Sequence, residues 1–323
     1  MPNQKITLND DEMEFVASIR CESVSNYRKR KDTPSYRVRM NPREIKLLEK
    51  FRENQKHILE LKISDSKMPR ILVFDIETAP MRAYVWGKWK QDVDSSQFLS
   101  DWYVLSWAGK WLNNKNIMSD VLSPKEAINE NDSRIVKSLW NLFDQADLII
   151  AHNASRFDVP RMNTKYILND MIPPSPYRVI DTLVVARSAF SFTSNRLDDL
   201  AGYFKIEHKK ETSFELWDRC VRGDQEALDY MQEYNIKDVD ILEQLYIKLR
   251  PWIKNHPNLS LYLENEEETC PYCGSTNVAD TGTFTYTNVS KFSNVRCLDC
   301  HAIARRRISE YPKKKRKNLI TSC

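Results

Sequence analysis

Short apolar runs alternate with stripes of apolar residues at helical spacing along the middle of the chain, from about residue 68 to residue 252. A compact apolar run such as Ile71–Phe74 is typical of a strand that is buried on both faces. On this pattern we predict five strands, at residues 71–74, 104–112, 116–122, 147–151 and 178–183. The first three are expected to form a meander.

Helical stripes separate the later strands. Residues 133–145 and the segment after Arg156 are predicted as helices. A long helix is expected from about Asp224 to Leu249, where Pro251 ends it. Three strands, a helix, a strand, a helix, a strand and a terminal helix together predict an α/β fold.

One more helix is predicted near the N-terminus. Asn41 has the position of an N-cap, Pro42 that of the first helical residue, and Glu44 lies three residues after the cap. Apolar residues follow at helical spacing, namely Ile45, Leu48, Phe51 and Ile58. Such an amphipathic helix serves either as a DNA-binding element or as a docking arm, and we favour the docking arm.

Two acidic residues, Asp75 and Glu77, stand at the end of the first predicted strand. Because alternate residues of a strand point the same way, both carboxylates are expected to face one side of the sheet. Two like charges held a few ångströms apart raise each other's pKa unless a cation lies between them. A single acid at a strand end is usually a cap or a solvated residue, whereas this pair indicates a metal site.

A third acid, Asp158, follows the strand predicted at residues 147–151 and opens the next helix. Ligands of an open α/β sheet bind at the carboxyl ends of adjacent strands, so Asp158 is expected beside the first pair. The alternative is that Asp158 only caps its helix.

A fourth acid, Asp238, lies on the long terminal helix, four residues after Tyr234 and on the same helix face. Apolar residues at positions 228, 231, 242 and 249 place this face near a buried surface, where an unpaired charge is costly. Asp240 is the rival candidate, but at six residues from Tyr234 it belongs to another face.

In this order and at this spacing, the three segments resemble the three motifs of DEDD-type 3′→5′ exonucleases. The D-x-E motif is Asp75 and Glu77, the N-x₃-F-D motif is Asn153, Phe157 and Asp158, and the Y-x₃-D motif is Tyr234 and Asp238. The tyrosine defines the DEDDy branch, which is similar to the proofreading domains of family B DNA polymerases. The resemblance covers about residues 70–250, and the rest of the chain is too short for polymerase fingers or palm.

The resemblance implies a ribonuclease H-like fold, with a mixed five-stranded sheet flanked by helices, and a metal-dependent 3′→5′ exonuclease activity on DNA. Four carboxylates can hold two Mg²⁺ or Mn²⁺ ions, because these hard cations prefer oxygen ligands. By resemblance, Asp75 bridges both ions, and Glu77, Asp158 and Asp238 complete their shells. The expected reaction is two-metal hydrolysis of the phosphodiester bond at the 3′ end.

Other residues receive roles from the same resemblance. Tyr234 is expected to orient the attacking water and the scissile phosphate, because a tyrosine hydroxyl ordinarily has a pKa of about 10 and is a poor base at neutral pH. Asn153 and Phe157 are expected to support the terminal nucleotide of the substrate, although Phe157 could equally belong to the core. Asp181 is expected to be structural, and contact with the site is the alternative.

The same fold and acids serve RNA as well as DNA, so a 3′→5′ exoribonuclease is the nearest alternative. A nucleic-acid-binding protein without catalysis is another. The complete set of acids argues against the latter, because a binding module has no need of clustered carboxylates that face a polyanion.

Two C-x-x-C pairs, Cys270–Cys273 and Cys297–Cys300, are separated by 23 residues. This spacing predicts a zinc ribbon at residues 266–304, with four thiolates around one structural Zn²⁺ and a hairpin within 281–291. A disulfide or redox pair is the alternative. The other cysteines fit a reducing compartment; they are Cys21, Cys220 and Cys323.

Basic residues gather toward both ends of the chain, although the net charge is only +4. Seven lie between Arg28 and Arg43 and eight between Arg305 and Lys317, against one acidic residue in each stretch. Such runs are either solvated and disordered or bind a polyanion, and single-stranded DNA 3′ ends are the expected partner. We expect the ribbon and its basic tail to clamp nucleic acid; docking to a replication or repair protein is the alternative.

Four parts are therefore expected: a basic N-terminal arm (1–66), the exonuclease domain (67–255), the zinc ribbon (266–304) and a basic tail (305–323). No apolar stretch approaches the roughly 20 residues of a membrane span, and residues 1–11 lack the apolar core of a signal peptide. We expect a soluble, cytoplasmic protein of a bacterium or a phage-infected host. The run Lys313–Lys317 also resembles a nuclear localisation signal.

Overall fold

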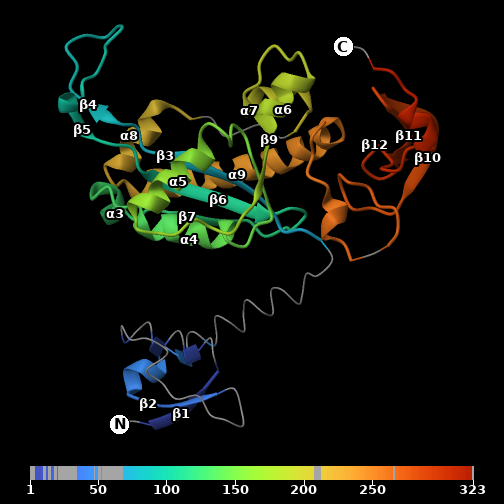
Figure 1. Cartoon of the computed structure of the whole chain (residues 1–323). Helices are drawn as coiled ribbons and strands as arrows, with labels where there is room; N and C mark the ends of the chain where they lie inside the picture. Colours follow the sequence, from blue (N-terminus) through green and yellow to red (C-terminus); the bar gives the residue numbers. More distant parts are fainter. Residues whose placement is uncertain are drawn as a thin grey trace. The chain divides into compact units, whose positions relative to one another are not determined.

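The computed structural model describes residues 4–9, 12–13, 16–17, 20, 35–46, 48–49, 52, 68–206, 212–264 and 266–321. The chain divides into two compact units, residues 1–67 and 68–323, which Figure 1 colours in sequence order. No helix in these described ranges combines the length and the apolar character that crossing a membrane requires.

The N-terminal unit contains a two-stranded antiparallel sheet in which β1 (Gln4–Leu8) pairs with β2 (Tyr36–Met40). These strands were not predicted. Alternate residues of β2 are buried, and they contribute to a small apolar core that includes Leu8, Val38 and Met40. This unit therefore has a core of its own.

The predicted N-terminal helix begins at residue 42 and is confirmed by its cap. The Asn41 side chain accepts a hydrogen bond from the backbone N–H of Glu44 at 2.9 Å, and the Glu44 side chain accepts one from the Asn41 N–H at 2.8 Å. This reciprocal pair is a capping box. Phe51, Ile58 and the basic run 28–31 lie outside the described residues.

The C-terminal unit is built around a mixed five-stranded sheet with the strand order β7-β6-β3-β8-β9. Its strands are β3 (Ile71–Thr78), β6 (Val104–Trp111), β7 (Met118–Val121), β8 (Leu148–Ala151) and β9 (Arg178–Asp181). The first three form an antiparallel meander, whereas β8 and β9 run parallel to β3. All five predicted strands are present.

Helices cover both faces of this sheet (Figure 1). They are α3 (Pro124–Ile128), α4 (Ser133–Phe143), α5 (Asp158–Leu168), α6 (Thr182–Ala189), α7 (Leu197–Tyr203), α8 (Phe214–Val221) and α9 (Gln225–Leu249). One apolar core contains Phe143 of α4, and the other contains Leu200 of α7. Helix α9 joins the two cores, because Met231 belongs to the first and Leu242 to the second.

Strand β3 is buried on both faces and divides its residues between the two cores. Leu72, Phe74 and Ile76 pack on one side, where the ring of Phe74 meets Phe143 edge to face with centroids 4.9 Å apart. Ile71 and Val73 pack on the other side. Because alternate residues of a strand share a face, the acids at positions 75 and 77 continue this second side, toward α9.

The prediction of a strand that runs to Leu183 is wrong, because β9 ends at Asp181 and α6 begins at the next residue. The Oδ1 atom of Asp181 accepts hydrogen bonds from the backbone N–H groups of Leu183 and Val184 at 3.0 and 3.3 Å. Asp181 is therefore an N-cap, which satisfies the first donors of the helix and ends the strand.

Several short elements were not predicted. They are α3, the ribbon of β4 (Arg82–Ala83) and β5 (Phe98–Ser100), and the 3₁₀ helices η2 (Ser95–Gln97), η3 (Arg250–Trp252) and η4 (Leu259–Tyr262). Segments of two to five residues show no hydrophobic period. Two of them carried a usable signal, a capping box: Ser123 with Glu126 for α3, and Asp94 with Gln97 for η2.

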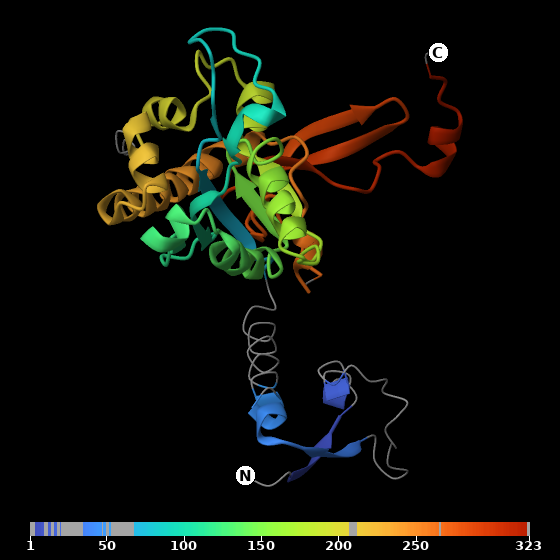
Figure 2. The same cartoon turned by 90° about the vertical axis from the view of Figure 1, so that its left-hand side faces the viewer.

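The cysteine-rich part forms a three-stranded sheet of β10 (Val278–Thr287), β11 (Ser290–Cys297) and β12 (Ile303–Arg305), followed by α10 (Lys313–Lys317). Figure 2 shows β10 and β11 as the two long strands of the predicted hairpin, which is confirmed. Backbone contacts continue beyond β12, because the N–H groups of Arg306 and Glu310 donate to the carbonyls of Ser293 and Lys291, both at 2.8 Å.

An aromatic contact joins this sheet to the core. Tyr272, between the first two cysteines, packs against the core of α9, and its ring lies 5.2 Å from the imidazole of His256. Nε2 of His256 is 2.8 Å from the Tyr246 hydroxyl, and Nδ1 is 2.7 Å from the Pro257 carbonyl. A neutral imidazole with its proton on Nδ1 donates to the carbonyl and accepts from the hydroxyl.

Burial lowers the pKa of His256 from 6.5 to about 4. Between these pH values the unfolded chain binds a proton that the folded chain does not, so stability is expected to fall as the pH is lowered through this window, by up to about 3 kcal/mol. Urea unfolding of the full chain at both ends of the window measures the loss. His256→Gln should lose less stability than the wild type over the same window; an equal loss would contradict the prediction.

Candidate active site

Three carboxylates meet where β3 ends. Asp75 and Glu77 lie on that strand and Asp238 on α9, and one oxygen of each lies within 4.8 Å of the others. Asp238 is buried, whereas Asp75 and Glu77 are half-buried. Negative charges at this separation repel one another, and carboxylate oxygens are the ligands that hard divalent cations prefer. The donor set therefore fits a divalent metal ion.

Asp158, the remaining predicted acid, is the first residue of α5 and is only 1% exposed. Its burial, and then the negative charge of Asp75, raise the pKa of this carboxyl well above its ordinary value, and nearby backbone N–H groups oppose the rise only in part. Neither of its oxygens has a well-formed hydrogen bond within the described part of the chain. Burial of such a group is costly, and a bound cation would offset that cost.

The alternative that Asp158 only caps its helix is not supported. Phe157 holds the N-cap position of α5, and no side chain caps this helix. Asp158 does not belong to the group of three within 4.8 Å, but the negative charge of Asp75 acts on its carboxyl, so the two side chains are neighbours.

Asp181 holds the loop that precedes α5. In addition to capping α6, its carboxylate accepts hydrogen bonds from the backbone N–H groups of Asn153 and Ser155 at 3.0 and 2.9 Å. Asn153 has a φ of 75°, in the left-handed region that asparagine tolerates better than most residues. Asp181 therefore positions this loop, in line with the structural role predicted for it.

A residue that sequence reasoning missed fixes the orientation of Asp75. Asn235 of α9 is fully buried, its Nδ2 donates to Asp75 Oδ2 at 2.7 Å, and its Oδ1 accepts from the Ser106 hydroxyl of β6 at 3.3 Å. This chain of hydrogen bonds ties α9 to two strands of the sheet. The sequence did offer one indication of this role. Asparagine is unfavourable inside a helix, because its side chain competes for backbone hydrogen bonds, so its presence there indicates a specific partner.

Two further polar residues of α9, Tyr234 and Asp240, have different surroundings. Tyr234 is 5% exposed, and its ring meets that of Trp217 of α8 in a T-shaped contact with centroids 6.3 Å apart. Asp240, the rival to Asp238, lies 3.7 Å from the Lys110 ammonium, which also pairs with Glu243 at 2.6 Å. This charge network gives Asp240 a structural partner, and Asp238 is the acid of α9 that joins the cluster.

A pocket of about 460 Å³ opens where the chain leaves β3, lined by residues that include Thr78, Met81, Trp102, Arg161, Phe214 and Trp217. Arg161 organises one wall: its guanidinium lies 4.5 Å from the ring of Trp102 and 4.3 Å from that of Phe157, and it donates to the Thr78 hydroxyl at 3.1 Å. Phe157 therefore supports Arg161. Aromatic faces beside a fixed cation suit a nucleobase and its phosphate. Sequence reasoning did not identify Trp102, Arg161 or Trp217.

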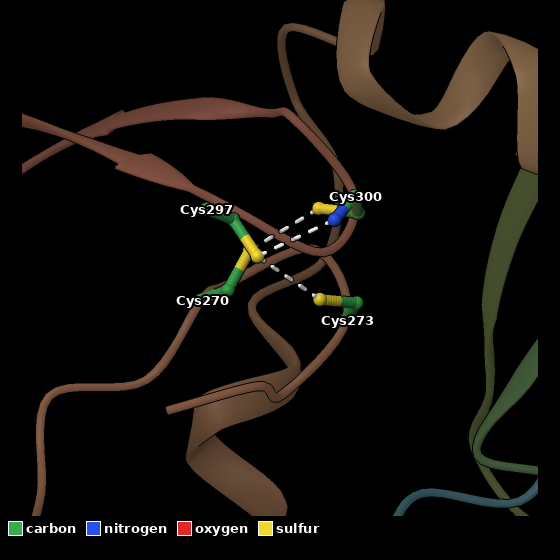
Figure 3. A group of neighbouring side chains, drawn as sticks. All are labelled: Cys270, Cys273, Cys297 and Cys300. Carbon is green, nitrogen blue, oxygen red and sulfur yellow. Dashed lines mark hydrogen bonds between the residues drawn. The ribbon is translucent and has the colours of Figure 1, made fainter. Parts of the chain in front are cut away.

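The four cysteines of the ribbon gather at one point (Figure 3). The Sγ atoms of Cys270 and Cys300 are 3.6 Å apart, as are those of Cys273 and Cys297, and all four lie within 4.8 Å of one another. Tetrahedral sulfur ligands at about 2.3 Å from zinc are about 3.8 Å apart, whereas a disulfide requires about 2.05 Å. The cluster is consistent with a small zinc-binding module. Cys220 is a separate buried thiol, and Cys21 and Cys323 lie outside the described residues.

Comparison with known families agrees with this fold and site. The RNase H superfamily matches residues 72–250, which run from the second residue of β3 to the residue after α9. The chain therefore belongs to the RNase H superfamily, and the predicted ribonuclease H-like fold is confirmed. A search of curated proteins finds no match. Membership supports a nuclease-type activity on nucleic acid, and the acidic cluster agrees with the divalent metals that such nucleases use.

We expect Asn235→Ala to weaken Mn²⁺ binding at the acidic cluster by about 10- to 100-fold, the usual effect of removing a group that orients a metal ligand. The substitution leaves every carboxylate in place and removes the donor to Asp75 together with the acceptor for the Ser106 hydroxyl. Isothermal titration with Mn²⁺, after the ribbon has been loaded with zinc, gives the affinity. Gln244→Ala, on the exposed side of the same helix, is the control; equal affinities for the two variants would exclude this positioning role.

Proposed function

We propose that the protein is a metal-dependent 3′→5′ exonuclease that shortens DNA from its 3′ end. The observation that carries the proposal is the meeting of Asp75, Glu77 and Asp238 within 4.8 Å, with buried Asp158 beside Asp75, in a fold of the RNase H superfamily. A protein that only bound nucleic acid would gain nothing from this cluster, because its charges repel phosphates.

In this proposal the four carboxylates hold two Mg²⁺ or Mn²⁺ ions, which the oxygen-only donor set favours. When bound, such ions supply a nucleophile at neutral pH and stabilise the leaving oxygen of the phosphodiester. The chain supplies orientation. Asn235 holds the Asp75 carboxylate through its 2.7 Å hydrogen bond, and the burial of Asp158 and Asp238 keeps those two side chains in place.

The role of Tyr234 in this proposal depends on where its side chain is held. It lies one helical turn before Asp238 on the same face, and its buried ring packs toward Trp217. We propose that its hydroxyl orients the scissile phosphate and the attacking water. A fixed side chain suits this role, because the rate depends on holding the reacting atoms in line.

The pocket beside the acids supports action at a chain end. Trp102 and Trp217 offer rings on which a terminal base can stack, and Arg161 offers a fixed charge to phosphate. We propose that Phe157 supports the terminal nucleotide through Arg161, and that Asn153 does so through the loop held by Asp181.

We further propose that the ribbon binds one Zn²⁺ through Cys270, Cys273, Cys297 and Cys300 and clamps nucleic acid outside the pocket. Its sheet presents cations over aromatic rings, with Lys291 at 3.5 Å from the ring of Phe284 and Arg305 at 4.1 Å from that of Phe292. The exposed helix α10 adds five consecutive basic residues. Arg306 contributes less, because it pairs with Glu268 and Asp280 at 2.7 and 2.6 Å.

Asp75→Asn and Asp238→Asn are each expected to abolish cleavage of a 5′-labelled DNA oligomer and to leave folding and single-strand binding intact. Each change removes a metal-binding charge at nearly constant side-chain volume. Tyr234→Phe should slow turnover without a loss of Mn²⁺ affinity. Rates are measured with Mg²⁺, Mn²⁺ and EDTA, and Asp240→Asn is the matched control. Activity at the wild-type rate in either acid variant would remove that acid from the site.

The direction of digestion is tested on the same oligomer. A bulky group on the 3′ end should stop digestion, because the pocket must receive the last nucleotide. Faster digestion of RNA than of DNA would change the proposed substrate to RNA. Rapid cutting of a covalently closed single-stranded circle would show endonuclease activity and exclude the exonuclease.

The basic helix α10 is tested by charge removal. Replacing all five residues 313–317 with glutamine should weaken binding of a long single strand and flatten the dependence of log K on log salt by roughly 0.7 per lost phosphate contact. The ribbon itself stays intact, because these residues follow its last strand. Lys115→Gln with Lys125→Gln, two exposed lysines of the core, is the control. An unchanged slope would mean that α10 does not touch nucleic acid.

A further inference from the structure

The hairpin formed by β4 and β5 presents two tryptophans to solvent. Trp86 is 98% exposed and Trp89 is 83% exposed, more than any other aromatic side chain among the described residues. Lys88 and Lys90 are also exposed and lie in the same loop, residues 84–94, which forms the tip of the hairpin. Figure 1 shows this loop projecting away from the sheet. Exposed apolar groups gathered at one place usually mark an interaction site.

The hairpin does not need these rings for its conformation. Two hydrogen bonds of 2.9 Å cross the hairpin. The backbone N–H of Tyr84 donates to the carbonyl of Gln97, and the side-chain amide of Gln97 donates to the carbonyl of Tyr84. The Gln91 amide donates to the carbonyl of residue 89 at 2.7 Å, and Asp94 caps η2 through a capping box. Polar contacts hold the loop, so the two indole rings are available to a partner.

The base of the hairpin is a wall of the pocket beside the acids. Thr78 and Met81 line the pocket, and β4 begins at the next residue, Arg82. On the returning strand, Trp102 lines the same pocket two residues after β5 ends at Ser100. Both strands therefore run outward from the pocket to the tip. A polymer whose end occupies the pocket has this hairpin as its neighbour.

We propose that Trp86 and Trp89 stack on unpaired bases of the substrate strand, on the 5′ side of the nucleotide held in the pocket, and that Lys88 and Lys90 contact its phosphates. The proposal rests on the proposed function in one respect, that the pocket receives the end of the strand. Every base has a π-face, so this contact grips the strand without reading its sequence.

The chemistry of the tip favours a nucleic-acid strand over a protein. Rings and cations alternate along Trp86-Gly87-Lys88-Trp89-Lys90, interrupted only by Gly87, as bases and phosphates alternate along a single strand. A protein interface has a continuous apolar centre from which lysine is depleted. Lys88 and Lys90 stand within this patch rather than at its rim.

The test measures binding of the full chain, carrying Asp75→Asn to prevent cleavage, to a long oligothymidylate by fluorescence anisotropy. Trp86→Ala with Trp89→Ala should weaken binding at least about ten-fold. The double change to phenylalanine should retain most of the affinity and the double change to leucine should not, because only the former keeps a ring to stack. Lys88→Gln with Lys90→Gln should lower the salt slope by about 1.4, which corresponds to two contacts.

A matched control distinguishes the loss of these two tryptophans from the loss of exposed apolar surface in general. Leu261→Ala with Ile172→Ala, at positions 81% and 72% exposed and outside the basic tail, should bind like the parent chain. With Asp75 restored, the Trp86→Ala, Trp89→Ala chain should cleave a trinucleotide at the wild-type rate, because so short a substrate stays within the pocket.

Three results would overturn the proposal. Unchanged affinity in the alanine variant would show that the hairpin does not touch the strand. Full affinity in the leucine variant would exclude stacking. A dimer that becomes monomeric in the alanine variant, with DNA affinity unchanged, would identify a second copy of this chain as the occupant. If the wild-type chain cleaves nothing, the proposed exonuclease activity fails, and the affinity comparison still decides the role of the hairpin.

Discussion

Repulsion among four carboxylates is the constraint on which the rest of this structure depends. Asp158 and Asp238 are buried, and burial together with Asp75 raises the pKa of Asp158 well above its ordinary value. The fold keeps the acids together because each lies on an element with its own apolar anchorage: β3 is buried on both faces, and α9 belongs to both cores. A divalent cation would relieve the repulsion that this packing imposes. The unfavourable electrostatics of the clustered acids and their suitability for metal binding therefore have the same origin.

The sequence was sufficient for features that depend on local pattern. Apolar runs identified β3 and β8, helical spacing identified α9, and the period of two predicted that Asp75 and Glu77 would share a face. It failed where a contact joins distant parts of the chain. The Asn235 amide bonds a carboxylate 160 positions earlier, and no local pattern records that pairing. The end of β9 was misplaced because the apolar residues on both sides of Asp181 are compatible with a strand. The side chain of Asp181 instead caps the helix that follows.

Cations beside aromatic rings recur at separate places in the C-terminal unit. Arg161 lies between Trp102 and Phe157 at the pocket, and Lys291 lies over Phe284 on the ribbon. This combination offers a π-face for a base and a charge for a phosphate, which a flexible single strand can use without sequence preference. The ribbon is joined to the nuclease core through Tyr272 and the neutral His256, so the four-cysteine cluster also supports one side of that core.

The most direct measurement of the central claim is the anomalous scattering of Mn²⁺ in crystals of the full chain. We predict a peak among the carboxylates of Asp75, Glu77 and Asp238, which lie within 4.8 Å of one another. A second peak is expected on the Asp158 side, about 3.5–4 Å from the first. Crystals saturated with Mn²⁺ that show no ion among these carboxylates, or ions only at other sites, would contradict a metal-dependent active site at the end of β3.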